Sequence, residues 1–301
     1  SSNNTVYADA EGNIGYFHGN FIPKRNPQID FSKSVDGTDP GTDWQGLHTV
    51  DESILILNPG TGWIQNCNST PFTAAGEFSP KRENYPFYMA PDQENFRGLH
   101  ASQLLSQQKE KLNLDTFLQL AYDPYLPAFS FLIPELLGSV SATLPAAYAP
   151  AMEQLRTWDY RTSKESVAMS IAHFYGENYQ RRFRSLNRFA QEDPKAKVPN
   201  SSEIQAVFIQ TIEQMTRDFG TWNTPWGEIN RFQRLSGAID ADFDDSKPYV
   251  PVGLASGNWG ALAAYGARAT STTKRLYGYR GNSFVAVVEF GEKVRAKSIL
   301  A

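Results

Sequence analysis

The chain has 301 residues, 41% of them hydrophobic, and a formal net charge of −4. This length and composition can bury a sizeable core, as one large domain or as two smaller ones. The acidic balance argues against a nucleic-acid-binding protein, which would normally present a basic face. No apolar run approaches the ~18 residues that a membrane span requires. The densest basic group, Arg181, Arg182 and Arg184, lies inside a helical pattern and is interpreted as a solvated helix face.

The first part of the chain has the pattern of short strands separated by turns. Gly12 and Asn13 tolerate positive φ, so the segment around them is expected to turn the chain between two strands of a hairpin. Residues 23–46 carry Pro, Gly, Asp and Asn with little periodicity, which predicts a long ordered loop. Strands are predicted over residues 5–8, 14–18, 53–57 and 63–66.

The middle of the chain has helical periodicity from Arg97 onward. Asp115 is expected to cap a short helix, and helices interrupted by proline follow to about residue 157. Ser163 is expected to cap a helix that runs to about Phe189. The clearest helix is predicted to start at Ser202, with Gln205 as the capping-box partner, and to end at Gly220.

Strand patterns return after residue 222, at 228–232, 276–279 and 283–290. The order of strands, helices and strands predicts an α+β fold in which a helical region is inserted between two halves of one sheet system. The corresponding predicted domains are a β-rich part over 1–96, a mainly helical part over 97–221 and a β-rich part over 222–301.

Metal and nucleotide sites find little support in the sequence. The four histidines, His18, His48, His100 and His173, lack the spacing of a zinc site. The acidic stretch Asp240, Asp242, Asp244 and Asp245 lacks the central Gly and the closing Glu of an EF-hand, so it is interpreted as a solvated loop. The glycines from Gly253 to Gly266 lack the Gly-Lys-Ser/Thr of a phosphate loop.

Ser256 and Cys67 are the two residues that their sequence surroundings suggest as candidate nucleophiles. Ser256 has Leu254 and Asn258 at the positions where a nucleophile elbow requires glycine, so it does not fit that motif. Cys67 is the single cysteine, and a small buried hydrophobe is the favoured interpretation over a reactive thiol.

The segment from Trp63 to Pro71 gathers Asn, Ser and Thr side chains at a predicted strand end. An asparagine amide can donate a hydrogen bond to an acyl oxygen that gains negative charge. The residues alone leave a second interpretation open, in which this is a polar turn whose asparagines serve as caps.

An ordered series of motifs resembles the β chain of the penicillin amidases. The series comprises Ala8-Asp9-Ala10-Glu11-Gly12-Asn13-Ile14-Gly15-Tyr16 with Gly19, Pro23 and Arg25, then Trp44-Gln45-Gly46, Asn58-Pro59, Gly62-Trp63-Ile64 and Asn66-Cys67-Asn68-Ser69-Thr70-Pro71. The later Pro225-Trp226-Gly227-Glu228 is similar to the family as well. The resemblance covers roughly residues 4–105 well and the rest more loosely.

This resemblance implies an N-terminal-nucleophile hydrolase with an αββα sandwich, in which a serine forms an acyl-enzyme during amide hydrolysis. It implies that Asn68 supplies the side-chain donor for the oxyanion and that Arg97 helps to orient the site. The substrate would be a small acylated compound of the penicillin type or an N-acyl amine, with an apolar acyl group. A periplasmic or secreted location is also implied.

The resemblance further implies that the chain is an interior and later part of the β chain. Neither Ser1 nor Ser2 is expected to be the nucleophile, because the hairpin after Asn4 matches a segment that follows the nucleophile strand. The expected partners are the missing α chain and the N-terminal part of the β chain, and this piece alone should be inactive. No cofactor is expected, except that the resemblance leaves calcium open, because it bridges chains in some relatives; its ligands have no match in this sequence.

Two alternatives remain at the level of sequence. An acyl-homoserine-lactone acylase of the same family would differ only in its acyl pocket. A non-catalytic module that binds sugars or peptides would use the aromatic loop between Phe72 and Phe96.

Overall fold

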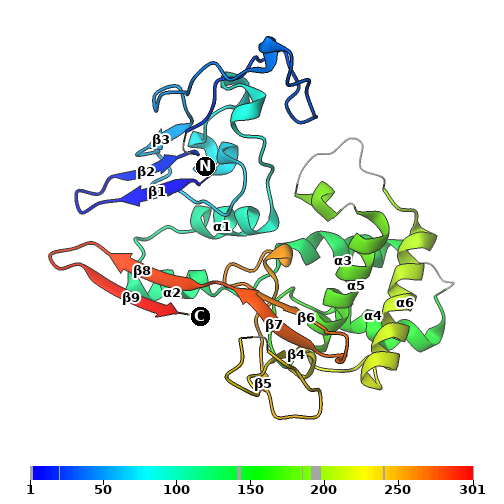
Figure 1. Ribbon diagram of the computed structural model, residues 1–301. Coiled ribbons are helices and arrows are strands. Elements are labelled where there is room, and N and C mark those ends of the chain that lie inside the picture. The colour runs from blue at the N-terminus through cyan, green and yellow to red at the C-terminus, as the bar shows by residue number, and fades with distance from the viewer. Residues whose placement is uncertain are drawn as a thin grey trace. The chain divides into compact units, whose positions relative to one another are not determined.

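The computed structural model describes residues 3–19, 21–140, 144–184, 186–190, 198–239 and 241–300. Helices and sheets are both present, as predicted (Figure 1). Ser1, Ser2 and Asp240, which figure in the sequence predictions, lie outside the described residues. The chain divides into unit 1, formed by residues 1–114 and 288–297, and unit 2, formed by residues 115–287 and 298–301. The three predicted domains are a different partition and stay a prediction.

Unit 1 is built on a three-stranded antiparallel sheet in the order β1-β2-β3. Its strands are β1 (Thr5–Ala8), β2 (Ile14–Phe17) and β3 (Leu55–Leu57). The turn between β1 and β2 is closed by Asp9, whose carboxylate accepts from Asn13 N at 2.8 Å and Asn13 Nδ2 at 2.9 Å. Gly12 has a φ of 89°, which glycine adopts without strain. The predicted hairpin is therefore confirmed.

The predicted strand over residues 63–66 is wrong. These residues run as an irregular segment, in which Gln65 N donates to Ala74 O at 2.8 Å and the ring of Trp63 lies against Gly76. Left-handed backbone at Gly62 and Asn68 interrupts the extended conformation on both sides. Alternation of apolar and polar residues predicted a strand here, but a strand also needs a neighbouring strand with which to pair.

The core of unit 1 lies between this sheet and a series of short 3₁₀ helices. Its buried residues come from β2, from the chain around β3 and from the loop beyond it: Tyr16, Ile54, Ile56, Ala74, Ala75, Met89 and Ala90. The 3₁₀ helices are Pro40–Thr42, Pro71–Thr73, Gly76–Phe78, Arg82–Asn84 and Phe87–Met89. The loop predicted over residues 23–46 contains the first of these and is otherwise irregular, as expected.

The α-helices begin in unit 1 and continue through unit 2. Their bounds are α1 (Phe96–Ser106), α2 (Leu114–Ala121), α3 (Pro127–Ser139), α4 (Ala149–Arg156), α5 (Val167–Phe183), α6 (Ser201–Phe219) and α7 (Trp226–Ile229). Further 3₁₀ helices are Ala146–Tyr148, Leu186–Phe189 and Gly257–Trp259. Within the described ranges, no helix is both long enough and apolar enough to cross a membrane.

The caps of the two longest helices correct the predicted starts. The cap of α5 is Ser166, whose side chain accepts from Met169 N, and the helix ends at Phe183 rather than near Phe189. Helix α6 is capped by Asn200 with Glu203 in a reciprocal capping box, so the predicted Ser202–Gln205 box is displaced by two residues. Asn200 is the cap because its side-chain oxygen accepts hydrogen bonds from two groups of the first turn, Ser202 Oγ and Glu203 N.

Unit 2 contains a four-stranded sheet in the order β5-β4-β7-β6, and Figure 1 shows helices α3 to α6 gathered to one side of it. Its strands are β4 (Asn230–Phe232), β5 (Val250–Pro251), β6 (Tyr265–Arg268) and β7 (Leu276–Gly281). The predicted strand over 228–232 is half wrong, because α7 continues to Ile229. Strands β8 (Phe284–Glu289) and β9 (Arg295–Leu300) form a separate two-stranded sheet.

An aromatic cluster fills the interior of unit 2. Phe129 on α3 lies 5.0 Å from the ring of Trp259, and both side chains are fully buried. Helix α5 approaches the same indole closely because Gly176 lacks a side chain: a Cβ there would lie 2.6 Å from Trp259 Cη2. Trp259 therefore joins α3 and α5 in one core.

We expect Gly176→Ala to destabilise the protein by about 1–3 kcal/mol, because the added methyl would overpack the site beside Trp259. Gly138→Ala is the matched control, since no atom of the described residues lies within 4 Å of a Cβ at that exposed helical position. There alanine should raise stability by up to about 1 kcal/mol. Denaturant unfolding measures both. An unperturbed midpoint for Gly176→Ala would show that the indole moves freely.

Candidate functional site

Asn68 lies in the irregular segment between Trp63 and the 3₁₀ helix that begins at Pro71. Its φ of 54° places it in the left-handed region, which asparagine tolerates better than most residues. The side chain is exposed. The segment turns sharply here because Thr70 caps the 3₁₀ helix and Pro71 occupies its first position.

Arg97 lies in the first turn of α1, and the structure brings it together with Asn68. Its Nη2 donates to Cys67 O at 2.7 Å and to Asn68 Oδ1 at 3.0 Å. One guanidinium group thus holds both the backbone and the side chain of the segment. The two residues that sequence reasoning selected belong to one cluster in unit 1.

The contact with Arg97 sets the orientation of the Asn68 amide. Because Oδ1 accepts from the guanidinium, the NH₂ group points away from it, toward solvent. The hydrogen bonds found for Asn68 among the described residues involve its backbone and Oδ1, and none involves Nδ2. Asn68 therefore presents a fixed neutral donor, and the charge of Arg97 polarises the amide further. Such a donor can stabilise a negatively charged oxygen.

Asn95 is a site residue that the sequence analysis missed. It caps α1 by accepting from Gly98 N at 3.0 Å. Its Nδ2 donates to Cys67 O at 3.1 Å and to Asn68 O at 3.3 Å. The position of an asparagine three residues before Gly98 is a signal of a helix cap, and that rule could have found it.

The ends of the intervening loop are held next to each other. Thr70 N donates to Gln93 O at 3.1 Å, and Thr73 Oγ1 donates to the carboxylate of Glu94. Gly98 makes this approach possible, since a Cβ there would lie 2.7 Å from Ser69 Oγ. The segment with Asn68 and the start of α1 are consequently joined by both backbone and side-chain hydrogen bonds.

Two further asparagines connect Asn68 to residues that flank β1 and β2. Asn66 Oδ1 accepts from Asn68 N at 3.3 Å and from Asn4 Nδ2 at 3.2 Å. Asn4 Oδ1 in turn accepts from Gly19 N at 3.0 Å. Gly19 lines a cleft of about 750 Å³, whose apolar wall includes Phe21, Ile22, Trp44 and Leu47. The side chains of Asn4 and Asn66 thus connect Gly19, at the edge of this cleft, to the backbone of Asn68 by hydrogen bonds.

Cys67 is half-buried beside this cluster. Burial raises the pKa of the thiol to about 11, an effect that Arg97 partly opposes. The thiol is therefore protonated at neutral pH and is a poor nucleophile.

The other candidates from the sequence do not form a site with Asn68. His18, His48 and His173 have different hydrogen-bond partners. His18 is hydrogen-bonded to Tyr16 and to Met89 O, His48 to Tyr88, and His173 to Trp259. In the described part of the chain, no three His, Cys, Asp or Glu residues are grouped so as to hold a metal ion. Asp245 accepts from Tyr277 Oη at 2.9 Å, which gives it a structural role. Ser256 belongs to a pocket in unit 2.

Most aromatic rings of the loop between Phe72 and Phe96 face inward. Phe72, Tyr85 and Tyr88 pack against the core of unit 1, and the guanidinium of Arg82 lies 4.4 Å from the ring centre of Phe72. Phe78 is 53% exposed and Phe87 is 61% exposed, so these two rings of the loop are the ones open to solvent.

Comparison with known proteins gives three findings. The profile of the family described as penicillin amidase matches residues 1–301. The penicillin G acylase of Escherichia coli is 40% identical over 68 residues, which are 23% of this chain and 8% of that protein. The solved structure of a thermostable penicillin G acylase from Alcaligenes faecalis has a TM-score of 0.49 and 19% identity, over 72% of this chain and 47% of that one. The chain thus covers less than half of either relative.

We expect alkylation of Cys67 by iodoacetamide at pH 8 to be roughly two hundred times slower than that of an unhindered cysteine, because so little thiolate exists below a pKa of about 11. The rate should rise tenfold per pH unit up to that pKa. Mass spectrometry after timed quenching measures it, and the unfolded protein is the fast control. Rapid reaction at pH 8 in the folded state would contradict this.

We expect Asn95→Ala to lower the free energy of unfolding by about 1 kcal/mol through loss of the cap, and to loosen the backbone at Asn68. Asn95→Asp keeps a cap acceptor but loses both N–H donors, so it should loosen Asn68 with a smaller loss of stability.

Ser166→Ala is the control, because it removes the cap of α5 without touching unit 1. Hydrogen–deuterium exchange of the peptide that contains Asn68 reports the loosening. Unchanged exchange in both Asn95 variants would show that Arg97 alone fixes the segment.

Proposed function

The chain belongs to the penicillin amidase family, and from this membership we propose that it forms part of an acylase that hydrolyses amide bonds. In this reaction a serine oxygen attacks the carbonyl carbon, and the carbonyl oxygen becomes negatively charged. The C–N bond then breaks, and the amine leaves with a proton. Water hydrolyses the resulting ester and releases the carboxylic acid.

Asn68 is the proposed donor to the negatively charged oxygen. The observation that carries this assignment is the hydrogen bond from Arg97 to Asn68 Oδ1, which leaves the amide NH₂ as a fixed outward donor. A preorganised donor stabilises charge in the transition state without having to reorient during the reaction. A free asparagine side chain would lose part of this benefit to rotation.

Arg97 is proposed as a positioning residue. Its two bonds to the segment are charge-assisted, so they resist thermal motion more than neutral bonds do. The guanidinium also makes the Asn68 amide a stronger donor, because it withdraws charge through Oδ1. Arg97 therefore acts through Asn68 and needs no contact with the substrate.

The nucleophile is proposed to come from a serine outside these 301 residues. Next to Asn68, Cys67 is protonated at neutral pH and Ser69 is 3% exposed, so neither suits attack on a substrate. The α-amine of an N-terminal serine would serve as the base, as expected for an N-terminal-nucleophile hydrolase. Unit 1 would then contribute its sheet to an αββα sandwich completed by the other segments of the protein.

The proposed substrate is a small compound with an apolar acyl group on an amine. The cleft lined by Phe21, Ile22, Trp44 and Leu47 supports this choice, because such walls remove apolar surface from water. Asn4 and Asn66 link the edge of that cleft to Asn68. The protein partners proposed are the remaining segments of the acylase, and the proposed location is periplasmic or secreted.

We expect Asn68→Ala, in the protein encoded by the complete reading frame, to lower kcat for an N-acyl amine by about 10²–10³, the usual loss for one oxyanion donor. KM should change little, because the donor acts mainly in the transition state. Steady-state kinetics with a chromogenic N-acyl aniline measures both quantities.

Asn58→Ala is the matched control, because it replaces another asparagine with positive φ in unit 1. Its kcat should stay near the wild-type value. If Asn68→Ala keeps full activity while Asn58→Ala is equally harmless, Asn68 has no part in the mechanism.

A further inference from the structure

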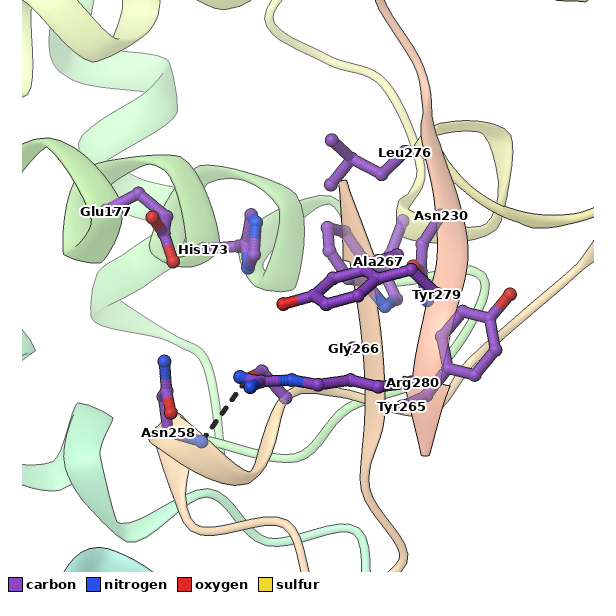
Figure 2. Close-up of a pocket in the computed structure, with 12 residues that line it drawn as sticks. His173, Glu177, Asn230, Asn258, Tyr265, Gly266, Ala267, Leu276, Tyr279 and Arg280 are labelled. Atoms are coloured by element: carbon purple, nitrogen blue, oxygen red, sulfur yellow. Dashed lines mark hydrogen bonds between the residues drawn. The ribbon is translucent and has the colours of Figure 1, made fainter. Parts of the chain in front are cut away.

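Unit 2 contains a small polar pocket that the proposed reaction does not use. It encloses about 60 Å³, and all the residues lining it belong to unit 2. Its deep part is formed by His173, Trp226 and Asn230, which are buried. Its outer part is formed by the exposed Asn258, Tyr279 and Arg280 (Figure 2). The space is large enough for a few water molecules or one small polar group.

His173 offers a neutral donor at the bottom of the pocket. Burial lowers the pKa of His173 to about 4, so the imidazole is uncharged at neutral pH. Trp259 Nε1 donates to His173 Nδ1 at 3.1 Å. Because an indole N–H can only donate, Nδ1 is the acceptor and the proton of the ring lies on Nε2. The packing of Trp259 thereby fixes the tautomer of His173.

Ser256 adds a second donor. Its Oγ accepts from Asn258 N at 3.2 Å as the cap of a 3₁₀ helix, which leaves the hydroxyl hydrogen available to the pocket. Asn258 adds a side-chain amide from the same turn. Both residues come from one short segment of the chain.

Arg280 supplies positive charge at the outer part. Its side chain extends from β7 across the pocket (Figure 2), and its register partner is Gly266 on β6. A Cβ at Gly266 would lie 2.6 Å from Arg280 Cγ, so glycine is what lets the arginine cross the strand. Within the described residues, the guanidinium of Arg280 has no carboxylate partner. It lies over the ring of Tyr279, with Cζ 5.3 Å from the ring centre.

Two acceptors also line the pocket. Asn230 is 1% exposed, and while its Nδ2 donates to Val252 O and Leu254 O, its Oδ1 has no hydrogen-bond partner. Glu177 lies one helical turn after His173, and burial raises the pKa of its carboxyl against the opposing effect of Arg181. A buried acceptor without a partner costs free energy, which a ligand carrying a proton or a water molecule would recover.

We propose that this pocket binds the carboxylate group of a small molecule between Arg280, His173 Nε2 and the hydroxyl of Ser256. The donors outnumber the acceptors, and the single cation stands where a ligand would enter. A planar carboxylate matches the fork of a guanidinium, whereas an ammonium group would meet Arg280 with like charge. The remainder of the molecule would extend past Asn258 and Tyr279 into solvent. Glu177 is the opposing wall, so its negative charge should limit the affinity.

The test titrates the complete protein with sodium [1-¹³C]acetate at constant ionic strength and follows the ¹³C line width. Saturable broadening that unlabelled acetate reverses is expected. Arg280→Gln should raise the dissociation constant about tenfold or more, through loss of charge-assisted bonds. Arg268→Gln is the matched control: its guanidinium also contacts the ring of Tyr279, at 4.7 Å, but it does not line the pocket.

The direction in which Glu177→Gln changes the affinity for acetate shows whether the bound ligand is an anion. If the ligand is an anion, removing the carboxylate should tighten acetate binding several-fold. Weaker binding in Glu177→Gln, an unchanged dissociation constant in Arg280→Gln, or equal competition by acetamide would each overturn the proposal. Absence of saturable broadening in the wild type would overturn it as well. Because Arg280 and Glu177 belong to unit 2, these outcomes are independent of the role of Asn68.

Discussion

The hydrogen bond between Arg97 and the side-chain oxygen of Asn68 is the interaction on which the candidate site depends. It crosses between an irregular segment and the first turn of α1, and it is the contact that gives the amide a direction. Without it, the left-handed backbone at Asn68 would still turn the chain, but the amide could rotate freely. Orientation of the donor is thus a property of a residue 29 positions away.

The surroundings of this contact explain why an irregular segment can be rigid. Within the described residues, no strand pairs with residues 63–66, so backbone pairing in a sheet does not hold them. Side-chain hydrogen bonds do so instead. Asn95 donates to two successive backbone carbonyl groups, and Asn66 accepts from the backbone N–H of Asn68 and from the side chain of Asn4. Asparagine suits this work because one planar group both donates and accepts. The same segment therefore combines fixed geometry with an exposed position.

Much of the fold could be predicted where the signal is local. The hairpin around Gly12 depends on a turn residue between two short strands, and the apolar stripe of α6 depends on spacing within one helix. Predictions failed where a distant partner decides the outcome. Residues 63–66 have a strand-like pattern but pair with no strand in the described part of the chain, and Glu228 and Ile229 are helical where the sequence predicts extended chain. The predicted cap of α6 is wrong because three consecutive residues, Asn200, Ser201 and Ser202, are all of a type that caps helices.

The candidate site divides in the same way. Asn68 and Arg97 were selected through resemblance to a family, because nothing in their local sequence links them across the intervening loop. Asn95 follows from a local capping rule, yet its second role, as a donor to Cys67 O and Asn68 O, depends on the fold. The pocket of unit 2 was out of reach of sequence reasoning, since its residues come from α5, β4, β6, β7 and a 3₁₀ turn.

The bond between Thr70 N and Gln93 O has a consequence for how this region can evolve. Together with the hydrogen bonds of Asn95, it closes residues 71–92 into a loop whose two ends stay adjacent. Insertions or deletions inside that loop need not displace either end, because a longer loop costs only a little more closure entropy. Homologous chains could therefore differ widely in length between these two points while the amide keeps its place.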